Sequence, residues 1–296
     1  MKKKTIATLF TLVLAFSAVG CGAKSEPATE TAAEAETTED AATEESTEEA
    51  TAEASEETTE ETAEEATEEA ATEESTEATG DVMTHADYVA ADLDSEVTVE
   101  TYVQAKQGWW ENEGVGNATF YTQAEDGAYF IYNMPCSQEE YDKLEAGTKI
   151  KVTGYKSEWS GEVEITDAKF EIEDGNYVAE ATDVTSMLAD DSIIDHQNEY
   201  VAFTDMVVEA SKDADGNDAA FLYNYDGSGS QGDDLYFNVS ADGKTYTFTV
   251  ESYLCDKDSD VYKAVENLKV GDTVDMKGFL YWYEGVNPHI TEVTVK

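Results

Sequence analysis

The chain has 296 residues, of which 67 are acidic, 17 are basic and none is arginine, so its formal net charge is −50 at pH 7. Binding to a nucleic-acid backbone needs clustered Lys and Arg, because these side chains displace counterions from the phosphates. The composition therefore disfavours nucleic acid as a partner.

The first 20 residues have the pattern of a secretory signal peptide. Lysines at positions 2–4 precede an apolar run over 6–19, which is too short to span a bilayer comfortably. The letters AVGC at 18–21 resemble the lipobox of bacterial lipoproteins. The resemblance implies cleavage before Cys21 and lipid attachment to its sulfur, which would anchor the protein at the outer face of the bacterial cytoplasmic membrane. An ordinary signal peptide with an incidental cysteine is the alternative.

Residues 21–80 are predicted to form a disordered stalk. From position 25 the segment consists almost entirely of Glu, Thr, Ala and Ser, with 22 acidic residues and no basic ones. Such a composition cannot bury enough apolar surface to offset the entropy lost on ordering, and like charges four residues apart oppose a helix. We expect the stalk to carry the rest of the chain clear of the membrane. An acidic tail that binds cations or basic partners is the alternative.

Residues 81–296 contain two copies of one pattern. The first copy reads YDKLEAGTKIKVTGYKSEWSGEVEITDAKF at 141–170, and the second reads YKAVENLKVGDTVDMKGFLYWYEGVNPHITEVTV at 262–295. Each contains a glycine, a strand of period 2 that ends in Gly154 or Gly278, and a closing strand that begins Ile-Thr. With 45 acidic residues and 13 lysines, residues 81–296 carry a formal charge of −32.

The elements before these strands also correspond. In the first copy the predicted elements are strands over 96–105, 118–123 and 128–134, and a helix over 137–144 that Ser137 and Glu140 cap. In the second copy they are strands over 199–210 and 219–225, a third strand over 235–239, 245–252 or both as an inserted hairpin, and a helix over 259–266.

Three strands, a helix and two further strands is the order of the OB-fold, a five-stranded Greek-key barrel. The run L-x-x-G-x-x-[IV]-x-[VM]-x-G-[YF] from Leu144 to Tyr155, with Leu268 at the matching place, resembles secreted bacterial OB-fold modules. The resemblance implies an all-β fold with two tandem five-stranded OB-like Greek-key barrels, at 81–175 and 176–296. Each would have a short helix between strands 3 and 4. The fold by itself does not select a ligand.

Four tryptophans lie in loops or strand ends that flank the usual OB binding groove. Trp109 and Trp110 follow the first strand, where the second copy has SKDADGND. A bulge at the glycine of strand 4 would turn Tyr155 and Trp159 inward and leave Trp282 facing outward. Because features of only one copy are candidates for function, Trp109, Trp110 and Trp282 are the leading ligand-binding residues, followed by Trp159. Tryptophan as a lid over the barrel core is the alternative.

The sequence predicts no metal, cofactor or catalytic site. The Asp-rich loops at 213–218, 226–234 and 256–260 lack the EF-hand spacing and fit turns or helix caps, with Ca²⁺ binding as the alternative. Cys136 and Cys255 occupy equivalent places in the two copies, so we expect buried thiols rather than a disulfide. Motifs of hydrolases, zinc proteases and phosphate-binding loops do not occur, which argues against an enzyme.

Together these features predict a lipid-anchored, non-enzymatic binding protein of the cell envelope. Aromatic rings beside a polar groove suit the apolar faces of sugars, so an oligosaccharide or glycan is the expected ligand. Two alternatives stay open. One is a module that holds another envelope protein, and the other is an acidic surface that recognises basic peptides or cations.

Overall fold

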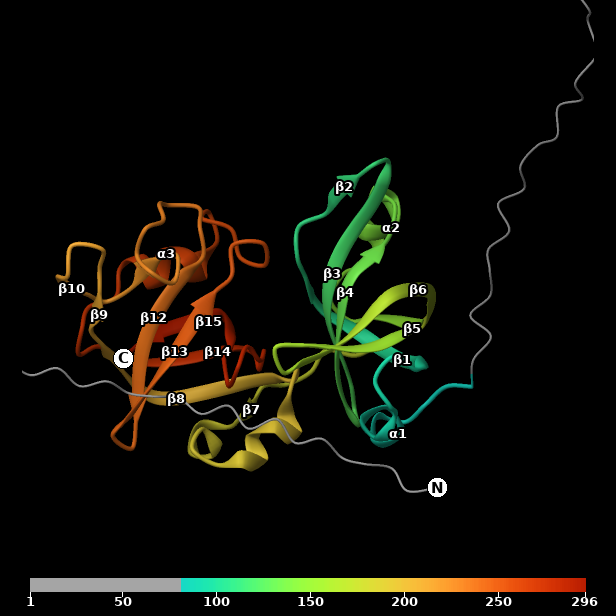
Figure 1. Cartoon of the computed structure of the whole chain (residues 1–296), viewed down its shortest axis with the longest axis horizontal. Helices are drawn as coiled ribbons and strands as arrows, with labels where there is room; N and C mark the ends of the chain where they lie inside the picture. The colour runs from blue at the N-terminus through green and yellow to red at the C-terminus, as the bar shows by residue number, and fades with distance from the viewer. Residues whose placement is uncertain (1–80) are drawn as a thin grey trace, which may run out of the picture. The chain divides into compact units, whose positions relative to one another are not determined.

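The structure, a computed structural model, describes residues 81–296, which belong to one compact unit. The predicted signal peptide, the lipidation site Cys21 and the acidic stalk lie outside the described residues. Within 81–296, no helix is long and apolar enough to cross a membrane. The fold is all-β, with two large sheets and a few short helices (Figure 1).

The first sheet contains a closed barrel of five strands. Its members are β1 (Glu96–Lys106), β3 (Val115–Ala124), β4 (Gly127–Pro135), β5 (Thr148–Trp159) and β6 (Glu162–Asn176). The order β1–β5–β6–β4–β3 returns to β1, and all these pairings are antiparallel except that of β4 with β6. The short β2 (Trp110–Asn112) pairs with the start of β3 (Figure 1).

Alternation of apolar residues explains why these segments form a barrel. Val97 and Val99 of β1 and Ile150 and Val152 of β5 are buried, and they share one hydrophobic core with residues of β3, β4 and β6. In β1 and β5 these residues stand at every second position and face the barrel interior, whereas β3 and β4 are buried over consecutive residues. The predicted strand order of the first copy is confirmed.

The helix α2 (Gln138–Lys143) lies between β4 and β5 and begins with the predicted capping box. The Glu140 N–H donates to the Ser137 hydroxyl at 3.3 Å, and the Ser137 N–H donates to the Glu140 carboxylate at 2.7 Å. Both bonds satisfy backbone donors that the start of a helix leaves free. The prediction of a short helix between strands 3 and 4 is therefore confirmed for the first copy.

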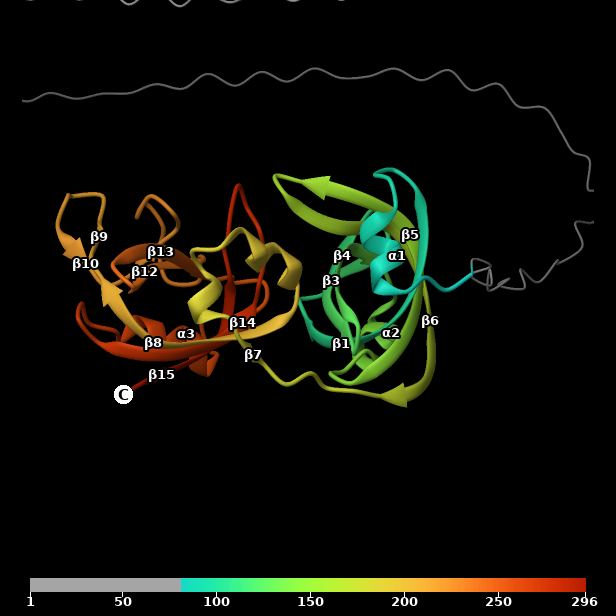
Figure 2. The same cartoon turned by 90° about the horizontal axis from the view of Figure 1, so that it is seen from below.

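The helix α1 (His85–Ala90) lies beside the first sheet (Figure 2), and a buried lysine attaches it there. Lys156 of β5 is 7% exposed, and its ammonium group donates to the carbonyl oxygens of Tyr88, Val89 and Ala91 at 3.0, 2.8 and 2.8 Å. The last carbonyl groups of a helix have no partner within the helix itself. Lys156 therefore supplies the donors that end α1.

The prediction that Gly154 resets the alternation of the strand is wrong. The pairing of β5 with β6 does shift register at this glycine, but Tyr155 is exposed and Lys156 is buried. Burial of the lysine is tolerated because three carbonyl groups replace its water. As a consequence, Trp159 at the end of β5 is exposed and does not cap the barrel from inside.

The second large sheet has five long strands. They are β8 (Tyr200–Glu209), β12 (Leu235–Ala241), β13 (Lys244–Val250), β14 (Thr273–Phe279) and β15 (His289–Val295). Their pairings repeat those of the first sheet: β8 with β12 and β14, β12 with β13, and β14 with β15 are antiparallel, and β13 with β15 is parallel. A separate hydrophobic core that includes Phe203, Phe237 and Phe248 fills this part.

The second copy differs from its prediction in one strand. Residues 219–225 were expected to form strand 2, which is wrong, because this region holds only β10 (Asp218–Ala219) and β11 (Leu222–Tyr223). The strands β12 and β13 form together as a hairpin and take the places of β3 and β4 in the pairing order. The helix α3 (Asp260–Glu266) begins where predicted, and the hydroxyl of its N-cap Ser259 accepts from the backbone N–H of Tyr262.

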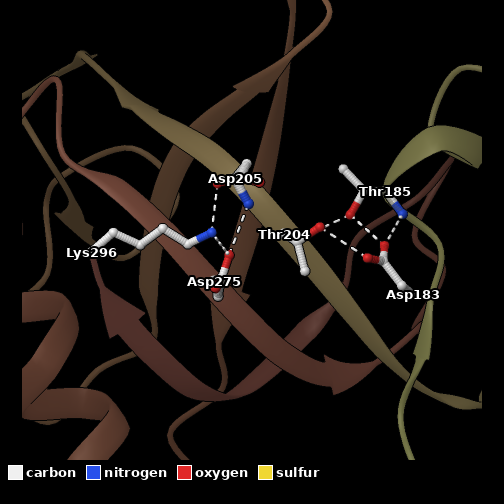
Figure 3. Close-up of polar contacts among 6 residues, drawn as sticks. All are labelled: Asp183, Thr185, Thr204, Asp205, Asp275 and Lys296. Carbon is white, nitrogen blue, oxygen red and sulfur yellow. Dashed lines mark hydrogen bonds and ion pairs between the residues drawn. The ribbon is translucent and has the colours of Figure 1, made fainter.

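The connection between the two sheets consists of β7 (Thr182–Asp183) and the 3-10 helices η1 (Thr185–Met187) and η2 (Asp191–His196). β7 pairs in parallel with β8. The Asp183 carboxylate accepts from the hydroxyl groups of Thr185 at 2.7 Å and Thr204 at 2.9 Å (Figure 3). These bonds hold the connection against β8.

A lysine at the end of the chain closes the second sheet. The Lys296 ammonium lies between Asp205 of β8 and Asp275 of β14, with nitrogen–oxygen distances of 2.5 and 2.9 Å (Figure 3). The Asp205 backbone N–H also donates to the Asp275 carboxylate at 2.8 Å. Because all three side chains are solvent-accessible, the network orders the chain end without contributing much stability.

Candidate ligand-binding cleft

A cleft of about 620 Å³ opens where residues of the first barrel meet residues of the second sheet. The residues that line it are Gln107, Gly108, Trp110, Phe130, Tyr132, Asn133, Trp159, Glu164, Glu251, Tyr253, Tyr281 and His289. Phe130 belongs to a small buried aromatic cluster with Tyr121 and Phe279, and the rings of Tyr121 and Phe279 stack at 4.4 Å between centroids. This cluster joins the two sheets and supports the cleft.

Four aromatic side chains of the cleft are exposed to solvent. The exposed fractions are 42% for Trp110, 45% for Tyr132, 54% for Trp159 and 72% for Tyr253. They come from β2, β4, β5 and the segment after β13, so the fold gathers them from distant parts of the sequence. A concentration of exposed aromatic rings around one cleft is typical of a ligand or partner site.

Glu164 of β6 places a carboxyl group in the cleft without a compensating partner. The residue is 8% exposed. Burial alone raises its pKa to about 7, since within residues 81–296 no hydrogen-bond donor or cation offsets the loss of water. Near neutral pH this carboxyl group therefore changes between its neutral and ionised forms.

Glu251, just after β13, contributes a second carboxyl group. Its Oε2 accepts a hydrogen bond of 2.9 Å from the Gln107 side chain, which follows β1 of the first barrel. Burial, and then the charge of Asp234, raise the pKa of Glu251 to about 8. The Gly108 N–H donates to the Tyr253 carbonyl at 2.8 Å, so this wall of the cleft is bonded across the two sheets.

His289, the first residue of β15, presents a neutral imidazole ring to the cleft. Its Nδ1 lies 2.6 Å from the Tyr121 hydroxyl, and its ring stacks on Tyr281 at 4.2 Å between centroids. Burial lowers the pKa of His289 to about 3 and raises the pKa of Tyr121 well above its ordinary value. Donation from the Tyr121 hydroxyl to Nδ1 satisfies that buried proton and leaves the imidazole hydrogen on Nε2.

The cleft thus combines flat aromatic surface with hydrogen-bond acceptors. Glu164 and Glu251 accept hydrogen bonds once ionised, and none of the described residues that line the cleft is a lysine. A ligand with a flat face and N–H donors would stabilise the ionised carboxylates, whereas an anion would meet two carboxyl groups without a cation. The cleft therefore favours ligands that carry hydrogen-bond donors over anionic ligands.

Two of the four predicted tryptophans, Trp110 and Trp159, line the cleft, and Trp109 and Trp282 do not. Trp109 is half-buried against the first core, and its Nε1–H donates to the Cys136 carbonyl at 3.0 Å. Trp109 thus packs on the barrel, which agrees with the alternative of a lid over the barrel core, whereas Trp110 is exposed. Trp282 packs against the core of the second sheet, so the prediction that it faces outward is wrong.

Three cleft residues were not predicted from the sequence: Glu164, Glu251 and His289. The repeat contained a signal that would have found two of them, because Glu164-Ile-Thr in the first copy stands where His289-Ile-Thr stands in the second. The parallel pairings of β4 with β6 and of β13 with β15 likewise put Tyr132 and Glu251 at corresponding positions. Polar or aromatic residues at equivalent positions of both copies line the same cleft.

The Asp-rich loops and the two cysteines have structural roles. The Asp213 carboxylate accepts from the backbone N–H groups of Asp215 and Asn217 at 3.0 and 2.7 Å, which closes a turn. Within residues 81–296, no group of three or more His, Cys, Asp or Glu side chains is placed to hold a metal ion. Cys136 and Cys255 are free, and burial raises the pKa of their thiols to about 11 and about 12, far from a reactive thiolate.

No protein-family model matches the chain, and a comparison with curated protein sequences finds no match. Similar solved structures include a murine DNA-binding protein bound to double-stranded DNA, at 12% identity over 67% of this chain and 94% of that chain, with a TM-score of 0.30. The Ifi202 HINa domain in complex with 20-base-pair DNA is similar at 13% identity over 68% of this chain and 98% of that chain, with a TM-score of 0.30. A Replication Protein A heterotrimer bound to single-stranded DNA is similar at 10% identity over 68% of this chain and 49% of that chain, with a TM-score of 0.29. The fold is OB-like, and at these values the likeness concerns the fold only.

These structures correct two expectations from the sequence. We expected a glycan-binding function and disfavoured nucleic acid as a partner, but the similar structures just named are complexes with DNA. The net charge disfavours contact with phosphates. OB barrels also bind bases by stacking them on aromatic rings, and this contribution to affinity does not depend on the net charge of the protein. The glycan expectation and the exclusion of nucleic acid are therefore withdrawn.

Proposed function

We propose that the chain binds a flat nitrogen heterocycle, of which the nucleobases are the common biological examples, in the cleft that Trp110, Trp159 and Glu164 line. The observation that supports this proposal is the presence of four exposed aromatic side chains, one buried and one half-buried carboxyl group, and no lysine in the lining of one cleft. Stacking of a base on an aromatic ring contributes about 1–3 kcal/mol. We propose binding without catalysis.

The carboxyl groups would favour heterocycles that present N–H donors along one edge of the ring. An ionised carboxylate accepts two parallel hydrogen bonds from neighbouring N–H donors, as guanine offers, and it accepts one from the amino group of cytosine. Uracil has no exocyclic amino group and should bind more weakly. Because residues 81–296 carry 45 acidic residues and 13 lysines, a nucleoside should bind more tightly than the corresponding nucleotide.

Titration of the tryptophan fluorescence of the purified protein tests the proposal. We expect saturable changes with guanosine and cytidine, weaker ones with uridine, and weaker ones with guanosine monophosphate than with guanosine. The substitution Trp159→Ala should weaken guanosine binding about tenfold, because it removes one stacking ring. Glu164→Gln should reduce the preference for guanosine over uridine.

The matched control is Tyr225→Ala, which removes an aromatic side chain that is 72% exposed and does not line the cleft. Its affinity should equal that of the unmodified protein. The proposal is overturned if no nucleoside gives a saturable change, or if Trp159→Ala and Tyr225→Ala bind guanosine equally well.

We further propose that residues 81–175 and 176–296 are two OB-like modules of a lipid-anchored surface protein. The common pairing order of the two sheets supports the modules, and the AVGC letters at 18–21 support the anchor. Fractionation of cells that produce the protein tests the anchor. The unmodified chain should be recovered with membranes, and a Cys21→Ser variant should be lost from them.

A further inference from the structure

A second cavity, of about 600 Å³, lies between α1, the β5–β6 hairpin and the end of η2. It shares no lining residue with the heterocycle cleft. Its wall is partly apolar, with Val89 and Ile194 among the lining residues, and the acidic side chains of Glu158 and Asp195 are exposed where it opens. The cavity is therefore a separate candidate site.

Two side chains that line this cavity each bury one oxygen atom without a hydrogen-bond partner. Tyr88 and Asn198 are each 3% exposed, and the Tyr88 hydroxyl and the Asn198 Oδ1 have no partner. The orientation of the Asn198 amide is settled, because its Nδ2 donates to the Val163 carbonyl at 3.1 Å. Buried polar atoms without partners cost about 1–3 kcal/mol each and are uncommon. A ligand that satisfies them would gain that free energy.

A third oxygen without a partner belongs to Glu162, the completely buried first residue of β6, whose chain neighbours Gly161 and Val163 line the cavity. Its Oε2 accepts from the Trp282 backbone N–H at 2.9 Å, whereas its Oε1 has no donor. Burial raises the pKa of Glu162 to about 8, and the Asn198 amide partly opposes that effect. The charge of Glu162 also adds to the effect of burial on the pKa of Tyr88, so the three groups are electrostatic neighbours.

Lys156 lines the cavity but does not provide the missing donors. The Lys156 ammonium already donates to three carbonyl oxygens of the α1 region. Three oxygen atoms in or next to the cavity therefore have no hydrogen-bond donor. A primary ammonium group supplies three N–H donors and one positive charge on a single nitrogen.

We propose that this cavity binds a primary alkylammonium group, with oxygen atoms of Tyr88, Asn198 and Glu162 as its hydrogen-bond acceptors. The alkyl chain would lie along Val89 and Ile194. A second ammonium group at the opening would meet the carboxylates of Glu158 and Asp195, so a short diamine suits the cavity better than a monoamine.

Isothermal titration calorimetry of the purified protein with 1,4-diaminobutane, butylamine and butanol tests this proposal. We expect saturable one-to-one binding of both amines, with the diamine bound more tightly, and no binding of butanol. Raising the salt from about 0.1 M to about 1 M shortens the Debye length from about 10 to about 3 Å. Butylamine held at a buried site should lose less than about threefold in affinity, whereas attraction to the acidic surface would be abolished.

Two substitutions separate the site from general charge effects. Tyr88→Phe removes only the hydroxyl group and should weaken butylamine binding about tenfold, because one hydrogen bond to a charged group is lost. Glu162→Gln keeps the shape, removes the charge and places an N–H donor next to the cavity, so it should weaken binding at least about thirtyfold. The control Tyr102→Phe changes a tyrosine of β1 outside the cavity and should have no effect.

The proposal is overturned if neither amine gives saturable heat at millimolar concentrations, if butanol binds as well as butylamine, or if both site variants bind butylamine like the unmodified protein. Thermal unfolding of each variant shows whether it is folded, and Glu162→Gln is expected to be at least as stable as the unmodified protein. Guanosine binding should be unchanged in both variants, so the heterocycle proposal and the ammonium proposal can fail separately.

Discussion

Single residues decide the chemistry of the heterocycle cleft, and the pair of Tyr121 and His289 shows how. The two side chains come from different sheets and are joined by a buried hydrogen bond of 2.6 Å. We infer that the Tyr121 hydroxyl donates to Nδ1, because its buried proton would otherwise have no acceptor, and this places the imidazole hydrogen on Nε2. The cleft therefore contains a donor, Nε2–H, whose presence depends on a residue that does not line it.

The substitution Tyr121→Phe tests this relation. In the unmodified protein, nitrogen NMR should show hydrogen on Nε2 of His289, and in the variant the two neutral tautomers should become mixed because Nδ1 has lost its donor. The loss of a buried hydrogen bond should also lower the free energy of unfolding by about 1–3 kcal/mol. Tyr200→Phe, which removes a hydroxyl bonded to the more exposed Glu292, is the control and should leave the tautomer unchanged. Hydrogen on Nδ1 in the unmodified protein would contradict the assignment.

The cleft residues were only partly predictable from the sequence. Trp110 was named as a candidate from its loop after the first strand, whereas Trp159 was expected to turn inward and was only the last of the four candidates. Glu164 and Glu251 were missed because their raised pKa values arise from burial between two sheets, which no local pattern records. A comparison of the two copies would have shown that Glu164 and His289 occupy equivalent positions, each with an ionisable side chain before Ile-Thr.

Among the elements, α1 depends on a residue far along the chain. Its last carbonyl groups bond to Lys156, which lies 65 to 68 residues later in the sequence. A six-residue helix is too short to be stable alone, so we infer that this contact holds it in place. The burial of Lys156 escaped prediction for the same reason, since the carbonyl groups that replace its water are supplied by tertiary structure.

Lys156→Met tests the role of this lysine. Methionine keeps much of the buried volume but donates no hydrogen bond, so three carbonyl groups lose their donor and the unfolding free energy should fall by about 2–4 kcal/mol. Hydrogen exchange of the α1 amides should rise more than exchange in β8. Lys169→Met, at an exposed position of β6, is the control and should change neither quantity. Unchanged exchange in α1 would contradict the assigned role.

The strands and capped helices were predictable because their signals are local. The alternation of β1 and β5 and the capping box at Ser137 were read from neighbouring residues. The apolar run at 219–225 has the composition of a strand, but β12 takes the place beside β8. The choice between these candidates depends on pairing with residues far away in the sequence, and propensity does not contain that information.

For the whole molecule, the buried carboxyl groups make stability depend on pH. Burial raises the pKa of Glu162, Glu164 and Glu251 to about 8, 7 and 8, from an ordinary value of 4.5. Between about pH 4.5 and pH 8 the folded protein holds protons that the unfolded chain has released, so the unfolding free energy falls as the pH rises. His289 acts in the opposite direction between about pH 3 and pH 6.5, because its pKa is lowered on folding.

We therefore expect a lower Tm at pH 8.5 than at pH 5.5, because three carboxyl groups outweigh one histidine over this range. Differential scanning calorimetry across this range measures the effect. A variant that combines Glu162→Gln, Glu164→Gln and Glu251→Gln should lose most of the decline between pH 5.5 and pH 8.5, since these three groups no longer titrate. A Tm that rises over this interval in the unmodified protein would show that the three carboxyl groups are not buried as described.

The equivalent positions that meet in the heterocycle cleft have a consequence for the origin of the chain. Glu164 corresponds to His289, Tyr132 corresponds to Glu251, and all four line one cavity. In a dimer with twofold symmetry the same surface of both subunits forms the interface. A residue near the symmetry axis therefore lies opposite the same residue of the other subunit. Duplication and fusion of a self-associating ancestral module would leave this arrangement. Once both copies were joined in one polypeptide, a carboxylate and an imidazole could replace two identical side chains, which no homodimer can do.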